Sequence, residues 1–121
     1  MSGDPEINSL EFRMSTAQLG DDDTYVLSVS GELDLHTTPR IRKELDAVVQ
    51  GGGRYVVVDL RDVGFVDTTM LATLVEALRQ LRAVHGELVV VSDDPRILRP
   101  FGIAGLDRLL RIEDSLSAAL N

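Results

Sequence analysis

The sequence predicts a single α/β domain whose mostly parallel sheet packs against about four helices. Short apolar runs alternate with helically periodic segments, most clearly at residues 55–60 and then 71–81. With 121 residues, 44% of them hydrophobic, the chain can bury one core but not two. We therefore expect one domain over residues 9–121, preceded by a polar, disordered segment at residues 1–8.

An antiparallel hairpin is expected first. Residues 11–19 form a candidate strand, and residues 24–30 alternate apolar and polar side chains as a half-buried strand does. The acidic stretch at residues 20–23 is expected to be the exposed turn between them, with no chemical role. Gly31 is expected to end the second strand.

A helix is expected next, from Thr37-Thr38-Pro39 to Gly51, because proline suits the first position of a helix and glycine its end. Its apolar face is Ile41, Leu45, Val48 and Val49.

The central strand and the helix after it organise the chain. Residues 55–60 are apolar and β-branched up to Asp59, as in a strand covered on both faces. The helix then carries an apolar stripe at Leu71, Leu74, Val75, Leu78 and Leu81. A loop between strand and helix is expected to deliver Asp67, Thr68 and Thr69 to the helix start.

The remaining pattern predicts a strand at 88–91, a helix opened by Asp94-Pro95, a short strand at 109–112 and a last helix at 113–120. Pro100 lies inside the first of these helices and removes an amide from its hydrogen-bond ladder. We expect that helix to kink or to end before Gly105.

Charge and composition exclude several functions. The net charge is −8, and residues 1–24 hold six acids against Arg13 alone, so phosphate backbones and anionic lipids are repelled. Aromatic residues make up only 4% of the chain, which leaves few platforms for stacked bases. The absence of cysteine excludes disulfides and cysteine metal sites, and residues 1–10 lack the features of a signal peptide. A cytoplasmic protein with a protein partner is expected.

Enzymatic interpretations find little support. Asp34, His36 and Thr68 can be drawn as a triad, but no G-x-S-x-G elbow accompanies them. His85 lies at a helix end, outside any metal motif, and the glycines at 51–53 lack the lysine of a phosphate loop. We expect no catalysis, cofactor or metal.

The helix start at residues 67–69 has two interpretations. Asp67 or Thr68 can cap the helix by accepting from its first N–H groups. The same N–H groups and the helix dipole can hold a phosphate carried by a hydroxyl there.

Four motifs together resemble one family. Residues 65–71, Phe-Val-Asp-Thr-Thr-Met-Leu, resemble the aromatic-x-Asp-Ser/Thr-Ser/Thr-Gly-Leu signature of STAS domains, especially bacterial anti-anti-sigma factors. Three further segments match in the same order: residues 29–34, 86–91 and 98–106. The resemblance covers residues 25–120.

The resemblance implies a function. Such proteins bind an anti-sigma factor that is also a Ser/Thr kinase, so that a sigma factor is released, and phosphorylation ends the binding; a phosphatase can reverse it. The phosphorylated residue corresponds to Thr68, with Thr69 as second candidate. The implied partner contacts are Glu32, Asp34, Asp67, Thr68, Thr69 and Met70.

Met70 departs from the family, which usually has glycine there. Its side chain is expected to project beside Thr68 and hinder access of a kinase. The departure keeps an alternative open: a STAS scaffold subunit that is never phosphorylated, in an ABC-type lipid transport complex or a larger signalling assembly.

Overall fold

The computed structural model describes residues 11–20 and 22–121. The expected disordered segment at residues 1–8 lies outside the described residues. Within them, no helix is long and apolar enough to cross a membrane.

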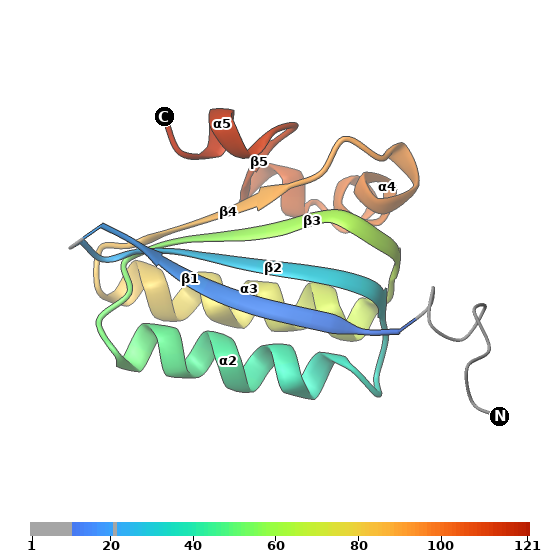
Figure 1. Cartoon of the computed structure of the whole chain (residues 1–121). Helices are drawn as coiled ribbons and strands as arrows, with labels where there is room; N and C mark the ends of the chain where they lie inside the picture. Colours follow the sequence, from blue (N-terminus) through green and yellow to red (C-terminus); the bar gives the residue numbers. More distant parts are fainter. Residues whose placement is uncertain (1–10, 21) are drawn as a thin grey trace, which may run out of the picture.

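A five-stranded mixed sheet forms the centre of the fold (Figure 1). Its spatial order is β1-β2-β3-β4-β5, with β1 antiparallel to β2 and all other neighbours parallel. The strands are β1 (Arg13–Leu19), β2 (Thr24–Leu33), β3 (Tyr55–Val66), β4 (Glu87–Val91) and β5 (Arg111–Glu113). The predicted α/β class, the opening hairpin and the central place of residues 55–60 are confirmed.

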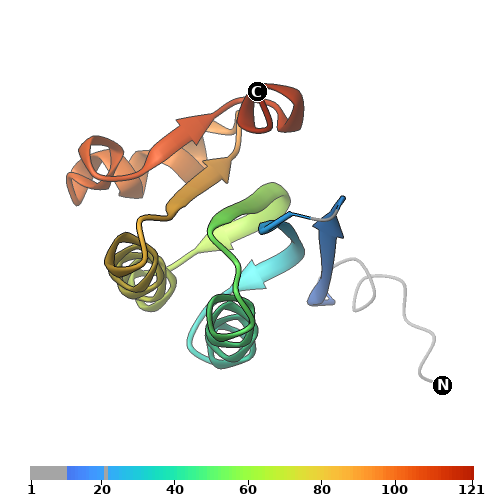
Figure 2. The same cartoon turned by 90° about the vertical axis from the view of Figure 1, so that its left-hand side faces the viewer.

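Helices cover both faces of this sheet (Figure 2). They are α2 (Thr38–Gln50), α3 (Thr68–Ala83), α4 (Pro95–Ile103) and α5 (Leu116–Ala119), with a 3₁₀ turn η1 (Leu106–Arg108). The predicted apolar stripes of α2 and α3 face the sheet, with Ile41 and Leu74 fully buried.

The strands separate two apolar clusters because successive side chains of a strand point to opposite faces. Val56 and Val58 join the larger cluster, which α2, α3 and α4 complete. Val57 points the other way, into a smaller cluster with Val89 that Ala119 of α5 closes.

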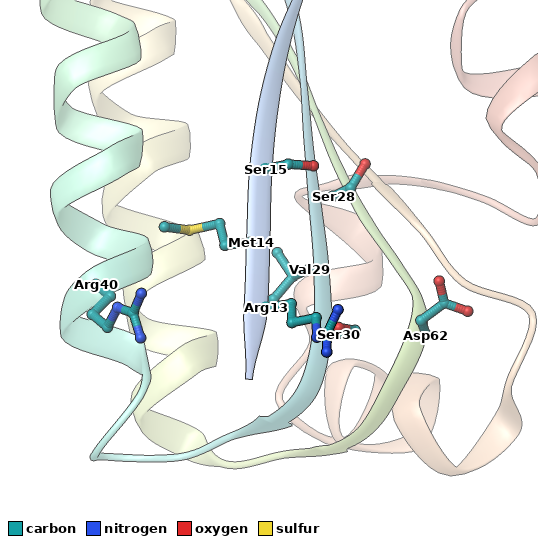
Figure 3. Close-up of a pocket in the computed structure, with 8 residues that line it drawn as sticks. All are labelled: Arg13, Met14, Ser15, Ser28, Val29, Ser30, Arg40 and Asp62. Atoms are coloured by element: carbon teal, nitrogen blue, oxygen red, sulfur yellow. The ribbon is translucent and has the colours of Figure 1, made fainter. Parts of the chain in front are cut away.

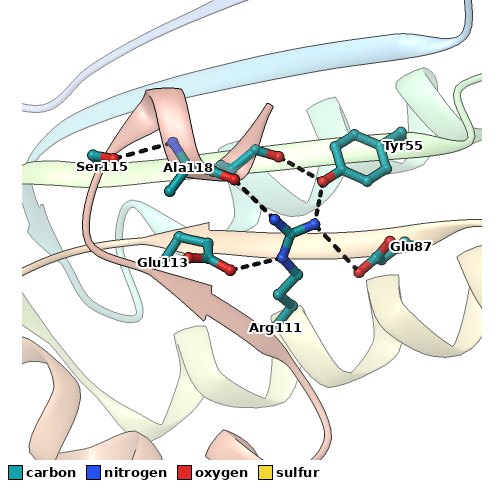
Figure 4. Close-up of polar contacts among 7 residues, drawn as sticks. Tyr55, Glu87, Arg111, Glu113, Ser115 and Ala118 are labelled. Atoms are coloured by element: carbon teal, nitrogen blue, oxygen red, sulfur yellow. Dashed lines mark hydrogen bonds and ion pairs between the residues drawn. The ribbon is translucent and has the colours of Figure 1, made fainter. Parts of the chain in front are cut away.

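Arg111 of β5 holds α5 against this second face (Figure 4). Its guanidinium donates to the Tyr55 hydroxyl at 2.6 Å, to the Ala118 carbonyl at 2.8 Å and to Glu113 at 2.8 Å. Glu87 lies 3.9 Å away. One side chain therefore joins β3, β5 and α5.

Gly31 does not end β2, contrary to expectation. The strand continues to Leu33, with irregular register on either side of Gly31. Gly31 has a φ of +101°, and a Cβ there would lie 2.9 Å from the Glu11 carbonyl oxygen. The glycine thus permits a bulge in β2 and the close approach of the backbone at Glu11.

The C-terminal elements match the prediction in order but not in length. Asp94 caps α4 by accepting from the Arg96 amide, and α4 contains Pro100 and ends at Ile103, before Gly105. The last strand begins at Arg111 rather than residue 109, and α5 has four residues instead of eight.

Candidate functional site

Only Asp67 separates β3 from α3. The expected strand ended at Leu60, followed by a loop, but β3 continues to Val66. The extension has a partner, because Leu33 of β2 pairs with Val66. The Asp67 amide then donates to the Leu33 carbonyl at 3.0 Å. The helix start is therefore fixed to the sheet.

Asp67, rather than Thr68, caps α3. Its backbone is extended, and its Oδ1 accepts from the Met70 amide at 3.1 Å. Thr68, the first residue of the helix, is exposed, and Thr69 is half-buried. The cap leaves the Thr68 hydroxyl on the surface beside the positive end of the helix dipole.

The expectation for Met70 is wrong. Its side chain is fully buried in the larger core cluster. With Asp67 as cap, Met70 is the third residue of the helix, and this position faces the sheet. The Met70 side chain therefore offers no contact to a partner and does not stand beside Thr68.

The turn after β2 lies next to this helix start, at the same end of the molecule (Figure 1). Glu32 pairs with Phe65 across the parallel strands, which are about 5 Å apart. A Cβ on Gly64 would lie 2.8 Å from Glu32 Oε2, so the Glu32 carboxylate rests over Gly64. The structure thus brings Glu32 and Asp67, predicted from separate motifs, together at the carboxyl ends of β2 and β3.

Asp34 is held as an anion by its own turn. The amides of His36 and Thr37 donate to its Oδ1 at 2.9 and 3.2 Å. The His36 hydrogen bond is the main reason that the pKa of Asp34 lies below its ordinary value. The Thr37 hydroxyl donates to the Glu32 carbonyl at 2.8 Å and braces the turn. Asp34 is therefore a pre-positioned carboxylate.

Sequence reasoning missed two exposed apolar residues at this end. Leu35, beside Asp34, is 62% exposed, and Phe65, beside Glu32, is 47% exposed. Exposed side chains of this size offer apolar contact area to a protein partner. Phe65 is the first residue of the motif at residues 65–71, and this position could have indicated its role. No feature of the sequence indicates that Leu35 is exposed at the site.

The site is a surface rather than a deep cavity. A hollow of about 530 Å³ lies elsewhere, along β1 and β2 beside Arg13 and Arg40 (Figure 3). A smaller hollow of about 310 Å³ lies next to Thr69, and Arg42 and Thr73 also line it.

The described part of the chain lacks the groupings that metal sites need. No three His, Asp or Glu side chains gather to hold a metal within residues 11–20 and 22–121. The Asp34 carboxylate is engaged by the backbone amide of His36, and His85 is exposed beyond the end of α3. The arrangement suits binding of a macromolecule and modification of a hydroxyl.

Comparison with known proteins gives consistent results. The family model described as STAS domain matches residues 16–119. An "Anti-sigma-B factor antagonist" of Staphylococcus aureus is 34% identical over 93 residues, which is 77% of this chain and 86% of that protein. The Listeria monocytogenes protein of the same name is 32% identical over 94 residues, 78% of this chain and 82% of that protein.

A solved structure agrees in fold. The crystal structure of an anti-sigma factor antagonist from Mycobacterium paratuberculosis superposes with a TM-score of 0.78 and 31% sequence identity. The superposition covers 89% of this chain and 92% of that one.

Proposed function

This chain belongs to the STAS domain family, and we propose that it acts as an anti-sigma factor antagonist switched off by phosphorylation of Thr68. In its unmodified form it binds an anti-sigma factor that is also a Ser/Thr kinase, and a sigma factor is released. A phosphatase restores the binding form. Two findings support the proposal. The similar proteins described above are anti-sigma factor antagonists, and α3 begins with an exposed hydroxyl.

One observation supports the proposal best: Thr68 is exposed, and the neighbouring Asp67 caps the helix without using the Thr68 hydroxyl. Asp67 already accepts the Met70 amide, so Thr68 can carry a phosphate without loss of a capping bond. The contact surface around it combines carboxylates, Glu32 and Asp34, with exposed apolar side chains, Leu35 and Phe65. The apolar groups supply contact area, and the carboxylates supply charge for a basic partner surface.

Phosphorylation changes this surface through charge. The kinase transfers the γ-phosphoryl group of ATP to Thr68 Oγ1, the hydroxyl proton passes to a base of the kinase, and ADP leaves. The phosphate adds about −1.5 to −2 charge. A partner surface fitted to a neutral hydroxyl beside Asp67 then meets a hydrated dianion, and affinity falls.

Phosphate mapping tests the modification. The purified chain is incubated with an anti-sigma factor kinase of the same genome, Mg²⁺ and ATP, and its peptides are sequenced by mass spectrometry. We expect phosphate on Thr68, and a Thr68→Ala variant that takes up none. Phosphate confined to Thr69 would contradict the assignment.

Calorimetric titration of variants tests the switch. We expect Thr68→Glu to weaken binding of the anti-sigma factor by about tenfold or more, because it places a carboxylate in the contact. Thr68→Ala should retain binding. Ala83→Glu adds the same charge at the far end of α3 and serves as the control. Equal affinities for Thr68→Glu and Thr68→Ala would reject the mechanism.

The scaffold alternative loses its main support. Met70 favoured it as a side chain that blocks access to Thr68, but Met70 is buried in the core.

A further inference from the structure

The free edge of β1 is a second exposed feature, on the margin of the sheet (Figure 2). In the strand order of the described residues, β1 is terminal and pairs with β2 alone. Every residue from Ser15 to Leu19 is exposed. A terminal strand of this length presents a row of backbone N–H and C=O groups that another strand can pair with.

This edge lacks the features that usually block such pairing. Proteins protect terminal strands with lysine, proline, bulges or very short lengths. Here Met14 to Leu19 contain no charged residue and no proline, although 26% of the chain is charged. Pairing with β2 is regular from Arg13 opposite Ser30 to Leu19 opposite Thr24, without a bulge. The outer edge is therefore straight, and none of residues 11–20 and 22–121 pairs with it.

The strand is also held ready. Thr16 Oγ1 donates to Glu44 Oε2 of α2 at 2.6 Å, and Met14 packs against the larger core cluster. In Figure 3, Met14 points toward α2, whereas Ser15 points away from it. Because β1 is already held by α2 and the core, it loses little conformational entropy when a further strand binds.

We propose that β1 pairs antiparallel with β1 of a second copy of this chain, so that two sheets join across a twofold axis. The register that pairs the whole strand with itself sets Thr16 opposite Thr16, Ser15 opposite Ala17 and Arg13 opposite Leu19. Such an interface is closed, because each copy contributes the same edge.

Charge complementarity favours a second copy as the occupant. In this register Arg13 reaches the turn that follows β1 of the other copy, where Asp22 and Asp23 are exposed. The Arg13 side chain is 72% exposed, and its one ion pair within the described residues is a long contact with Glu11, at 3.7 Å. The pairing of Arg13 with the acidic turn occurs twice across the twofold axis. Each exposed ion pair adds only a little to the affinity, and the backbone hydrogen bonds between the two strands supply most of the binding free energy.

The dimer is compatible with the proposed switch. β1 and β2 are antiparallel, so the Arg13 end of β1 lies toward the Thr68 end of the molecule. The twofold axis then places the two Thr68 sites at opposite ends, away from the shared strands. The dimer therefore leaves the proposed anti-sigma factor site accessible. A test of dimerisation does not depend on whether Thr68 is phosphorylated.

Sedimentation of the full chain tests the dimer. We expect reversible dimerisation between about 5 and 500 µM, since one strand pair makes a small interface. Ser15→Glu combined with Ala17→Glu places carboxylates opposite each other across the axis and should raise the dimer Kd at least tenfold. Ala83→Glu combined with Ala104→Glu adds the same charge on helix ends and should leave the Kd unchanged. Unchanged dimerisation in the β1 variant would overturn the proposal.

A charge exchange tests the register. Arg13→Glu should weaken the dimer, and Arg13→Glu with Asp22→Arg should restore it, because the pair is reversed. Glu11→Gln, the control, should not weaken it. Hydrogen exchange gives a second readout: amides within residues 14–19 should gain protection as concentration rises. A chain that remains monomeric throughout, with exchange independent of concentration, would refute the proposal.

Discussion

Asp67 and Thr68 divide two tasks between neighbouring residues. The Asp67 carboxylate satisfies the Met70 amide, and the exposed Thr68 hydroxyl is left for partner contact. The sequence admitted either residue as cap, because both types accept from a helix start. The extended backbone of Asp67 decides between them.

The first prediction separates these tasks. Asp67→Ala should lower the free energy of unfolding by about 1 kcal/mol, the usual loss for a helix cap. Thr68→Ala should change it by less than about 0.5 kcal/mol, since Thr68 is exposed. Urea denaturation of both variants measures the difference. Equal losses would mean that Thr68 shares the capping role.

Met70 illustrates what a motif does not reveal. The motif places Met70 at the start of the helix. The direction of its side chain depends on which residue caps the helix and on the core that packs against that helix. The glycine of the family signature suggested a surface role for this position, whereas Met70 fills the core.

The second prediction follows from that burial. Met70→Gly should lower the free energy of unfolding by about 3 to 5 kcal/mol, through a cavity and a more flexible backbone. Met70→Leu should cost less than about 1.5 kcal/mol because it nearly conserves volume. Guanidinium midpoints of the two variants give the comparison. A loss under about 1 kcal/mol for the glycine variant would contradict the packed position.

At the scale of elements, periodicity predicted best where many residues repeat one pattern. The stripes of α2 and α3 and the run at 55–60 were predicted correctly because burial imposes them residue by residue. Boundaries depended on distant partners. β3 extends to Val66 because β2 continues beside it, and β2 continues because Gly31 accommodates a bulge.

The C-terminal end shows the same limit. An eight-residue helical pattern yields a four-residue α5, whose place depends on contacts with Arg111 and with Tyr55, which is 64 residues away from Ala119 in sequence. No local pattern reports such contacts.

The third prediction tests this attachment of α5. Arg111→Lys should raise hydrogen exchange at residues 116–119 and lower the free energy of unfolding, since an ammonium cannot reach all three acceptors. Arg96→Lys, at the exposed pair with Asp94, is the control and should have little effect. Unaltered exchange in α5 would show that apolar packing alone holds it.

At the scale of the whole molecule, the parallel strands β2 and β3 bring their carboxyl ends to one edge, and the candidate site lies there. The fold class and the approximate location of this site could be predicted from patterns and resemblance. The apolar Leu35 and Phe65 could not, because exposure depends on how the entire surface closes around them.

The fourth prediction concerns the pH dependence of stability. Burial alone raises the pKa of Asp59, which is only 7% exposed, but hydrogen bonds and charge from Arg61 at 2.7 to 3.1 Å outweigh it, and the pKa lies below its ordinary value. A carboxyl with a lowered folded-state pKa stabilises the fold above its unfolded pKa and loses that contribution as pH falls through the folded value. The free energy of unfolding should therefore decrease below about pH 4.

Removal of the cation identifies the group responsible. Arg61→Ala leaves Asp59 with burial and one backbone amide, so its pKa rises relative to the parent chain. Arg61 is partly exposed, and after solvent screening we expect a loss of about 1 kcal/mol at pH 7. By the same linkage, the difference between parent and variant should shrink as pH falls from about 4 through the lowered folded-state pKa of the parent, because Asp59 is protonated in both chains below that value. Urea titrations from about pH 2.5 to 7 measure this difference. A difference that stays constant over the range would assign the stabilisation to packing of the Arg61 stem instead of its charge.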